Sequence, residues 1–222
     1  MSYMKKSRAK KDLAITGITA KWYSKNSKAR LAELAKVADM IAAKTHEGAK
    51  ILEVAPGPGY LSIELARRGF DVTGVELSED FVKIEKANAA EANAAVNFLQ
   101  GNASALPLAN ETVDFIVCMA AFKNFSEPQK ALDEMQRVLK PQGIALVIDM
   151  NRENSDADIE EAMRDYPDMK GFDRWFVKLS FKTFLKKGAY NQREFEEYIS
   201  RTAFSEQEII KRGTGFHIWL NK

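Results

Sequence analysis

The sequence predicts an α/β fold: a doubly wound, mostly parallel sheet of seven strands with helices on both faces and an antiparallel C-terminal hairpin. Three observations predict it. Short apolar runs alternate with helical patterns of about 10–15 residues, which is typical of parallel βαβ units. The run 113–119 is almost uniformly apolar, as in strands covered on both faces. Residues 206–222 form two strand patterns around Arg212-Gly213-Thr214-Gly215, a hairpin signal.

Each element has its own signal. A first helix is predicted after Ser27 as N-cap, with Leu31, Leu34, Val37, Ala38 and Ile41 on one face, in a segment that ends at Gly48. Ser78 is the predicted N-cap of a helix over 79–93, and further helices run through 61–66 up to Gly69 and over 127–139. Pro141-Gln142-Gly143 is predicted to turn the chain into the fifth strand. The strands expected before the hairpin are 50–54, 72–76, 96–100, 113–119 and 144–149.

The chain outside this alternation is expected to serve other roles. Residues 1–20 form a basic arm, either a flexible solvated tail or a contact for phosphates or anionic lipid. Residues 21–222 are expected to form a single domain. Within it, 152–200 look helical throughout, with an acidic stretch over 151–168 and a basic, aromatic one over 170–186. We expect 152–200 to be a cap that recognises the substrate, because recognition sits in insertions on a shared scaffold.

Composition excludes several classes of protein. Of 222 residues, 45% are hydrophobic and 29% charged, which excludes disorder, and a net charge of +2 gives no reason to expect nucleic acid as partner. One cysteine, Cys118, excludes an internal disulfide, and two distant histidines, His46 and His217, argue against a metal site. No apolar run reaches membrane length and the start lacks a secretory signal, so we expect a cytoplasmic location. Composition leaves the oligomeric state open.

A glycine-rich turn after the first strand indicates a ligand site. The run Ala55-Pro56-Gly57-Pro58-Gly59 lies between a strand and a helix, where backbone N–H groups reach the carboxyl edge of a parallel sheet. The run 57–62 approximates the dinucleotide pattern G-x-G-x-x-G, and Glu76 follows near the spacing of a ribose contact. Against that ligand, Pro56 and Pro58 remove two N–H donors, and serine replaces the third glycine. An NAD(P)-dependent oxidoreductase therefore stays open as one alternative.

Five segments in order resemble the motifs of class I S-adenosylmethionine (SAM)-dependent methyltransferases of small-molecule type. They are 51–59 (Ile-Leu-Glu-Val-Ala-Pro-Gly-Pro-Gly), 72–78, 100–107, 113–117 and 132–143, the last ending in Leu-Lys-Pro-Gln-Gly. The resemblance covers about residues 48–150 and implies that they form the cofactor-binding core, with SAM as cofactor. It also implies these cofactor-binding residues: Glu53, Ala55, Gly57, Pro58, Gly59, Glu76, Leu77, Asn102, Ala103 and Met119.

The resemblance further implies roles for individual side chains. Glu53 anchors the loop and the methionine end of SAM, and Glu76 accepts two hydrogen bonds from the ribose hydroxyls. Leu77 packs on the adenine, while Asn102 meets the adenine amino group with the Ala103 backbone beside it. Two positions depart from the usual pattern: Ala55 replaces a glycine, and Asn102 replaces an aspartate whose accepting role its carbonyl can still fill.

The acceptor is predicted to be a small molecule. The Asn/Asp-Pro-Pro-aromatic run of nucleic-acid methyltransferases and the double glutamate of arginine methyltransferases are absent, and Cys118 lacks the proline that cytosine enzymes place before their nucleophile. Transfer would be an in-line displacement that depends on positioning and desolvation, with no general base or metal identified. Tyr23, Lys123, Asn124 and Asp149 are candidates to face the substrate, the alternatives being core or solvated loop. A SAM-binding module without catalysis is the second alternative.

Overall fold

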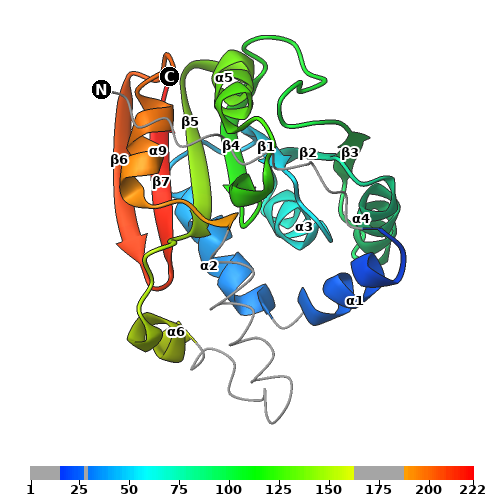
Figure 1. The fold of residues 1–222 in the computed structure, drawn as a ribbon. Helices are drawn as coiled ribbons and strands as arrows, with labels where there is room; N and C mark the ends of the chain where they lie inside the picture. The colour runs from blue at the N-terminus through cyan, green and yellow to red at the C-terminus, as the bar shows by residue number, and fades with distance from the viewer. Residues whose placement is uncertain (1–15, 28–29, 163–187) are drawn as a thin grey trace.

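The computed structural model describes residues 16–27, 30–162 and 188–222. Its seven strands form one sheet in the order β3-β2-β1-β4-β5-β7-β6 (Figure 1). The pairs β1–β2, β2–β3, β1–β4 and β4–β5 are parallel, whereas β7 pairs antiparallel with both β5 and β6. The strands are β1 (Lys50–Val54), β2 (Asp71–Glu76), β3 (Val96–Gln100), β4 (Val113–Met119), β5 (Leu139–Met150), β6 (Glu206–Arg212) and β7 (Gly215–Asn221).

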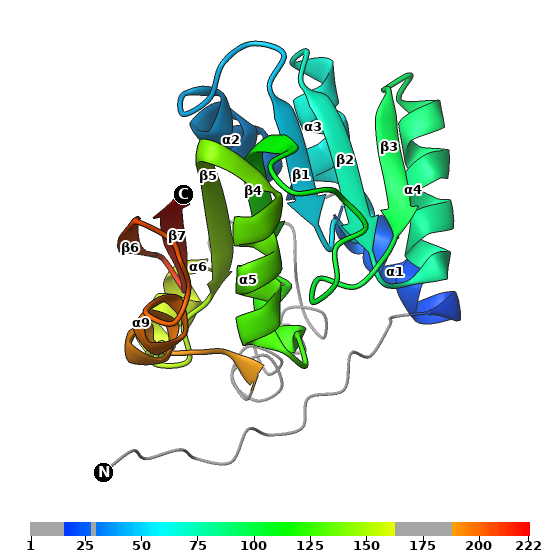
Figure 2. The ribbon, with the colours of Figure 1, turned by 90° about the horizontal axis from the view of Figure 1, so that it is seen from above.

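Helices cover both faces of this sheet, so the predicted fold class is confirmed. On one face pack α2 (Leu31–Ala42), α3 (Tyr60–Arg67) and α4 (Glu79–Glu91); on the other pack α5 (Pro128–Val138) and α9 (Gln192–Ile199). Figure 2 shows α5 and α9 on the opposite side of the strands from α2 and α3. The remaining described helices are α1 (Gly17–Ser27), the 3₁₀ turn η2 (Phe122–Asn124) and α6 (Asp156–Ala162). No described helix has the length and apolar composition that crossing a membrane requires.

The strand order reverses between β1 and β4, and this reversal places the site. From β1 the chain proceeds outward to β2 and β3, then returns to β4 on the other side of β1. The loops that follow β1 and β4 therefore lead to opposite faces and leave a crevice at the carboxyl ends of these strands.

Local signals predicted most element ends in the first half of the chain. The bounds of β3 and β4 match the predicted runs, and Ser78 caps α4 by accepting a hydrogen bond from the Phe81 N–H at 3.3 Å. The N-cap assigned to Ser27 was wrong. Ser27 is the last residue of α1, and its hydroxyl donates to the Tyr23 carbonyl at 2.8 Å, so α2 begins after Arg30 without a side-chain cap.

The fifth strand is longer than predicted. It begins at Leu139 and includes Pro141-Gln142-Gly143, which were expected to form a turn before it. The strand accommodates these residues through a shift in its register with β4, and Gln142 adopts a positive φ of 66° there. The chain therefore passes through these residues as an irregular part of β5 and makes no separate turn.

The prediction of helix throughout 152–200 was also wrong for the described part of that range. It contains two short helices, α6 and α9, and Tyr190 lies in an extended segment that bridges to Asn151. Residues 163–187, which include the whole basic aromatic stretch, lie outside the described residues, as do 1–15 of the basic arm. Residues 17–20, assigned to the arm, belong to α1, where Ala20 is fully buried.

Candidate active site

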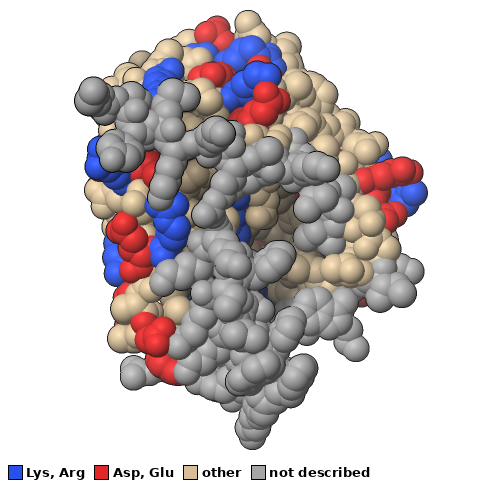
Figure 3. Space-filling view, viewed as in Figure 1, with Lys and Arg blue, Asp and Glu red and all other residues tan. Residues whose placement is uncertain are grey.

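A cavity that is open to solvent lies at the carboxyl ends of β1, β2 and β4, and its empty space is about 1000 Å³ when the open solvent at its mouth is included. Figure 3 shows a hollow in the surface, seen from the direction of Figure 1, whose described walls are mostly uncharged. Among the predicted site residues, the following line the cavity: Tyr23, Glu53, Ala55, Gly57, Pro58, Glu76, Leu77, Met119 and Asn124. The other ten lining residues were not among the predicted site residues: Ser27, Arg30, Leu34, Pro56, Tyr60, Leu61, Phe81, Ala120, Ala121 and Phe125.

The loop between β1 and α3, residues 55–59, forms one wall of the cavity, and we call it the cofactor loop. Ala55, Gly57 and Gly59 all adopt positive φ, at 57°, 60° and 77°. Glycine tolerates this conformation, and Ala55 shows that a methyl group is accommodated here. Three N–H groups of the loop bond within the protein: Ala55 donates to the Val75 carbonyl (2.8 Å), Gly57 to Glu76 (3.2 Å) and Gly59 to the Pro56 carbonyl (3.2 Å).

The Phe98 ring of β3 supports this loop from below. A Cβ atom on Gly59 would lie 2.9 Å from the Phe98 ring, and one on Gly74 of β2 would lie 2.6 Å from it. Real Cβ atoms essentially never come that close to another heavy atom. Both glycines are therefore required by close packing, and Gly59, although it does not line the cavity, fixes the distance between the loop and the sheet.

Glu76 connects the end of β2 to the cofactor loop. It is buried, and its two carboxylate oxygens accept hydrogen bonds from the N–H groups of Gly57 (3.2 Å) and Ser78 (2.9 Å). Burial raises the pKa of Glu76, and the hydrogen bonds from Ser78 and Gly57 oppose that rise. The carboxylate is thus held in one orientation at the cavity wall before any ligand binds.

Glu53, at the end of β1, is the second buried carboxyl group in the cavity wall. The Ser62 hydroxyl of α3 donates to its Oε2 at 2.5 Å. Burial raises the pKa of Glu53 to about 7, with a smaller contribution from the charge of Glu76, while the hydrogen bonds from Ser62 lower it. Glu53 therefore changes charge near neutral pH, and a nearby cation favours its ionised form.

A third carboxyl group, Glu85 of α4, lies behind the loop and was missed by sequence reasoning. It is fully buried, and neither of its oxygens has a hydrogen-bond partner among the described residues. Its Cγ lies 3.2 Å from the position that a Gly59 Cβ would take. Burial raises the pKa of Glu85 to about 9, with further contributions from Glu76 and Glu53. The available signal was its spacing, because it shares one helix face with buried Phe81 and Ala89.

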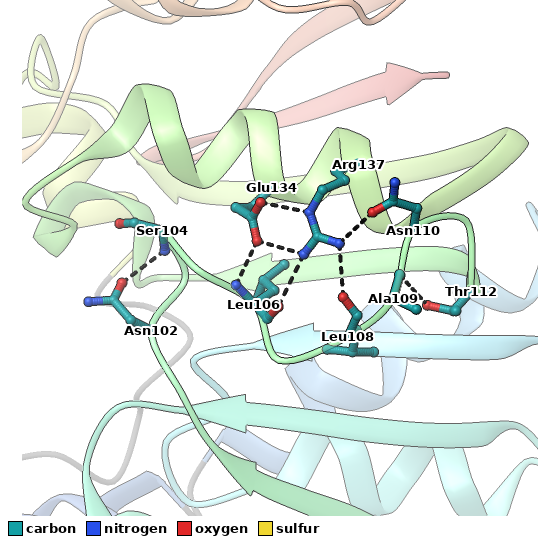
Figure 4. Close-up of polar contacts among 9 residues, drawn as sticks. All are labelled: Asn102, Ser104, Leu106, Leu108, Ala109, Asn110, Thr112, Glu134 and Arg137. Atoms are coloured by element: carbon teal, nitrogen blue, oxygen red, sulfur yellow. Dashed lines mark hydrogen bonds and ion pairs between the residues drawn. The ribbon is translucent and has the colours of Figure 1, made fainter.

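Asn102 and Ala103 lie in the loop after β3 and do not line the cavity. The Asn102 side-chain oxygen accepts a hydrogen bond from the Ser104 N–H at 2.8 Å. Figure 4 shows how α5 holds the rest of this loop. Arg137 donates to the carbonyls of Leu106 (3.1 Å) and Leu108 (2.9 Å), and Glu134 accepts from the Leu106 N–H at 2.7 Å. The adenine contacts of Asn102 and Ala103 stay a prediction.

Tyr23 brings the N-terminal helix α1 over the cofactor loop. Its ring lies 3.8 Å from where a Gly57 Cβ would be and packs edge-on against Phe81 at a centroid distance of 6.0 Å. The Gly17 N–H, at the start of α1, donates to Asp80 at 2.8 Å. The helix is thus attached to α4 and places an aromatic ring above the loop.

Lys123 and Asp149 do not line the cavity. They form a buried ion pair, with 3.0 Å between Lys123 Nζ and Asp149 Oδ1, next to the wall formed by the chain after β4. The two side chains bind each other and do not reach the cavity, whereas the sequence predicted that they would face a substrate.

Among the described residues no group of three or more His, Cys, Asp or Glu could hold a metal ion. Cys118 is fully buried, and burial raises its pKa, which suits a core residue.

Comparisons with known proteins concern the part of the chain that carries this cavity. Residues 52–147 match a family model described as "Methyltransferase domain". The demethylmenaquinone methyltransferase of Renibacterium salmoninarum is 35% identical over 104 residues, which are 47% of this chain and 42% of that protein. The ubiquinone biosynthesis O-methyltransferase of Mesorhizobium japonicum is 29% identical over 152 residues, 62% of this chain and 61% of that protein. The chain thus spans about two fifths to three fifths of these relatives.

Solved structures show the same fold. A putative S-adenosyl-L-methionine-dependent methyltransferase from Methanococcus maripaludis has a TM-score of 0.74 at 24% identity, covering 95% of this chain and 97% of that one. A SAM-dependent methyltransferase from Aquifex aeolicus has a TM-score of 0.69 at 22% identity, covering 91% and 96%. At these identities the likeness concerns the arrangement of the sheet and its helices alone.

Proposed function

We propose that the chain carries a class I, SAM-dependent methyltransferase domain and transfers the methyl group of SAM to a small-molecule acceptor. The observation that carries the proposal is the cavity at the strand reversal, with the carboxyl groups of Glu53 and Glu76 held in its wall. The match of residues 52–147 to the methyltransferase-domain family supports it.

The cofactor loop fits SAM better than a dinucleotide. A pyrophosphate is bound by several unpaired backbone N–H groups. In this loop Pro56 and Pro58 have none, and those of Ala55, Gly57 and Gly59 already donate within the protein. SAM carries no phosphate, and its positive charges favour neighbouring carboxylates. The donor count and the two buried acids therefore both argue against an NAD(P)-dependent oxidoreductase.

The proposed mechanism assigns binding and positioning to this chain. SAM supplies, when bound, a methyl group already activated by its sulfonium. Glu76, oriented by Gly57 and Ser78, would accept hydrogen bonds from the ribose hydroxyls, which are stronger because the acceptor is charged. Glu53 would balance positive charge at the methionine end. Leu34, Met119 and Phe125 form apolar wall that excludes water, and a displacement gains most of its rate from such alignment and desolvation.

The acceptor belongs on the β4–β5 side of the cavity. If the ribose lies at Glu76 on β2, the opposite wall, formed by Met119 to Phe125, is left for the acceptor. A Cβ on Gly188 would lie 3.5 Å from the Lys123 carbonyl oxygen, so the chain lies next to this wall again at Gly188. That contact supports the proposal that 152–200 belong to the same domain and cover the acceptor. The relatives named above are a demethylmenaquinone methyltransferase and a ubiquinone biosynthesis O-methyltransferase, and the apolar wall suits a flat, apolar acceptor such as a quinone precursor.

A ligand-binding comparison tests the cofactor. We expect SAM and its demethylated product S-adenosylhomocysteine (SAH) to raise the melting temperature of the protein, because both bind the native state. NAD and NADP should leave it unchanged. A shift with a nicotinamide cofactor and none with SAM or SAH would reject the proposal.

A transfer assay tests catalysis. Methyl-labelled SAM is incubated with the protein and, in separate reactions, with demethylmenaquinone, a ubiquinone precursor and the small-molecule fraction of a cell extract. We expect label in one or more small molecules, which mass spectrometry then identifies. SAM binding without any labelled product would favour the alternative of a binding module without catalysis.

A further inference from the structure

The buried ion pair between Lys123 and Asp149 lies directly behind one wall of the cavity. Lys123 belongs to the 3₁₀ turn η2 after β4, and Asp149 ends β5. Their side chains are only 7% and 1% exposed. Neither touches the cavity, whereas Ala120, Ala121 and Asn124, which flank Lys123, all line it. The pair is thus one layer removed from any ligand.

The pair fixes the shape of the turn at three points. Asp149 Oδ2 accepts a hydrogen bond from the backbone N–H of Lys123 at 2.7 Å, and Oδ1 accepts from Lys123 Nζ at 3.0 Å. The same ammonium group donates to the carbonyl of Ala120. Ala120 has the unusual φ of 59°, and its own N–H donates to the Ile148 carbonyl at 2.7 Å. Residues 120–123 are therefore attached to the end of β5 through backbone and side chain together.

A buried ion pair is a poor means of adding stability, because the removal of two charges from water offsets most of their attraction. Apolar side chains could not make these hydrogen bonds, which hold the backbone where the left-handed Ala120 leads into the 3₁₀ turn η2. The geometry of the cavity wall, rather than the stability of the core, is what depends on it.

We propose that Lys123 and Asp149 are positioning residues for the methyl acceptor, which set the turn that carries Ala120, Ala121 and Asn124. The inference rests on the proposed function and refines it. Cofactor binding depends on Glu53, Glu76 and the cofactor loop on the other side of the cavity. Loss of the pair therefore impairs acceptor recognition and leaves the cofactor site intact.

Four variants separate positioning from stability. Asp149→Asn and Lys123→Met each leave one buried charge without its partner, so both are expected to lose stability. The double variant Lys123→Met/Asp149→Asn removes both charges, and its stability should return toward that of the wild type. Asp114→Asn weakens the ion pair between Lys140 and Asp114, where the carboxylate likewise accepts from a backbone N–H (Lys50, 2.9 Å) and a lysine ammonium (2.7 Å), and serves as the control, because Asp114 lies at the opposite end of β4 from the cavity.

Three measurements are made on each variant. Calorimetry gives the dissociation constant of SAH. Methyl transfer from labelled SAM is measured at several dilutions of the small-molecule fraction of a cell extract. The curve gives the amount of extract at which the rate is half-maximal and the maximal rate. Amide hydrogen exchange reports on the N–H groups of Lys123 and Asn124, the second of which donates to the Ala121 carbonyl at 2.8 Å.

For the double variant we expect SAH affinity within about twofold of wild type, a half-saturating amount of extract raised by about tenfold or more, and faster exchange at both amides. Asp114→Asn should match the wild type in all three. A double variant with wild-type half-saturation, or with SAH affinity reduced in parallel, would overturn the inference. Failure of the proposed function would instead appear in the wild type, as absence of SAH binding and of methyl transfer.

Discussion

Replacing Glu85 by glutamine should stabilise the protein at neutral pH. The carboxyl group of Glu85 is fully buried without a hydrogen-bond partner among the described residues, and burial raises its pKa from 4.5 to about 9. In the unfolded chain the group is ionised at pH 7, whereas in the folded protein it holds its proton. Folding therefore requires proton uptake, and the free energy of unfolding falls as pH rises from about 4.5 to about 9.

The size of the effect comes from the interval between the two pKa values. At pH 7 the solution lies 2.5 pH units above the unfolded value of 4.5, and each unit corresponds to about 1.4 kcal/mol. Protonation of Glu85 thus costs the folded state about 3 kcal/mol at pH 7. Glutamine has a similar shape and stays neutral, so Glu85→Gln removes this term. For a chain of this size the gain corresponds to a melting temperature about 6–12 °C higher.

Urea unfolding at pH 5, 7 and 8.5 measures the effect. The wild type and Glu85→Gln should agree within about 1 kcal/mol at pH 5, and the variant should become increasingly more stable above that pH. Glu91→Gln, at an exposed position near the end of the same helix, is the control and should show no such divergence. A difference that does not grow with pH, or a variant less stable than wild type at pH 8.5, would refute the reasoning.

Three further changes address the cofactor loop and its supports. Because burial raises the pKa of Glu53 to about 7, protons compete with a cationic ligand, and calorimetry should show SAM affinity rising about tenfold from pH 6 to pH 8 in wild type but not in Glu53→Gln. Glu76→Ala removes the acceptor proposed for the ribose and should raise the SAM dissociation constant by at least about tenfold, whereas Glu79→Ala, at an exposed position nearby, should leave it unchanged. Gly74→Ala forces a Cβ to within 2.6 Å of the Phe98 ring and should cost about 1–3 kcal/mol in urea unfolding. Recovery of that loss in a Gly74→Ala/Phe98→Leu double variant would identify the ring as the cause, and no recovery would contradict it.

The sheet was predictable because its signals are local. The apolar runs of β3 and β4 coincide with the strands, and Ser78 caps α4 through a hydrogen bond three residues along the chain. The longer β5 was not predictable, because a positive φ at Gln142 and a register shift let the strand pass through a sequence typical of a turn. The role of Ser27 was not predictable from the sequence either, because a serine hydroxyl can form a hydrogen bond at either end of a helix. Here it donates to the carbonyl of Tyr23, in the preceding turn of α1.

The site was predictable where it depends on the motif and not where it depends on packing. Glu53 and Glu76 end strands, so the fold itself brings them to one edge of the sheet. Glu85 lies in the middle of a helix, and its burial becomes visible only once α4 is packed behind the cofactor loop. In the same way, Lys123 and Asp149 lie 26 residues apart in sequence, and only the pairing of β4 with β5 makes them partners.

The cofactor loop has its shape before a ligand arrives. Its N–H groups are bonded to Val75, Glu76 and Pro56, two of its residues are prolines, and the Phe98 ring fills the space beneath it. Binding therefore requires little loss of conformational entropy from this part of the chain, and most of the contact free energy remains available as affinity. The proposed cofactor therefore meets a wall that is already formed, and Asp149 holds the opposite wall at Lys123 in the same way, through a backbone N–H and an ammonium group.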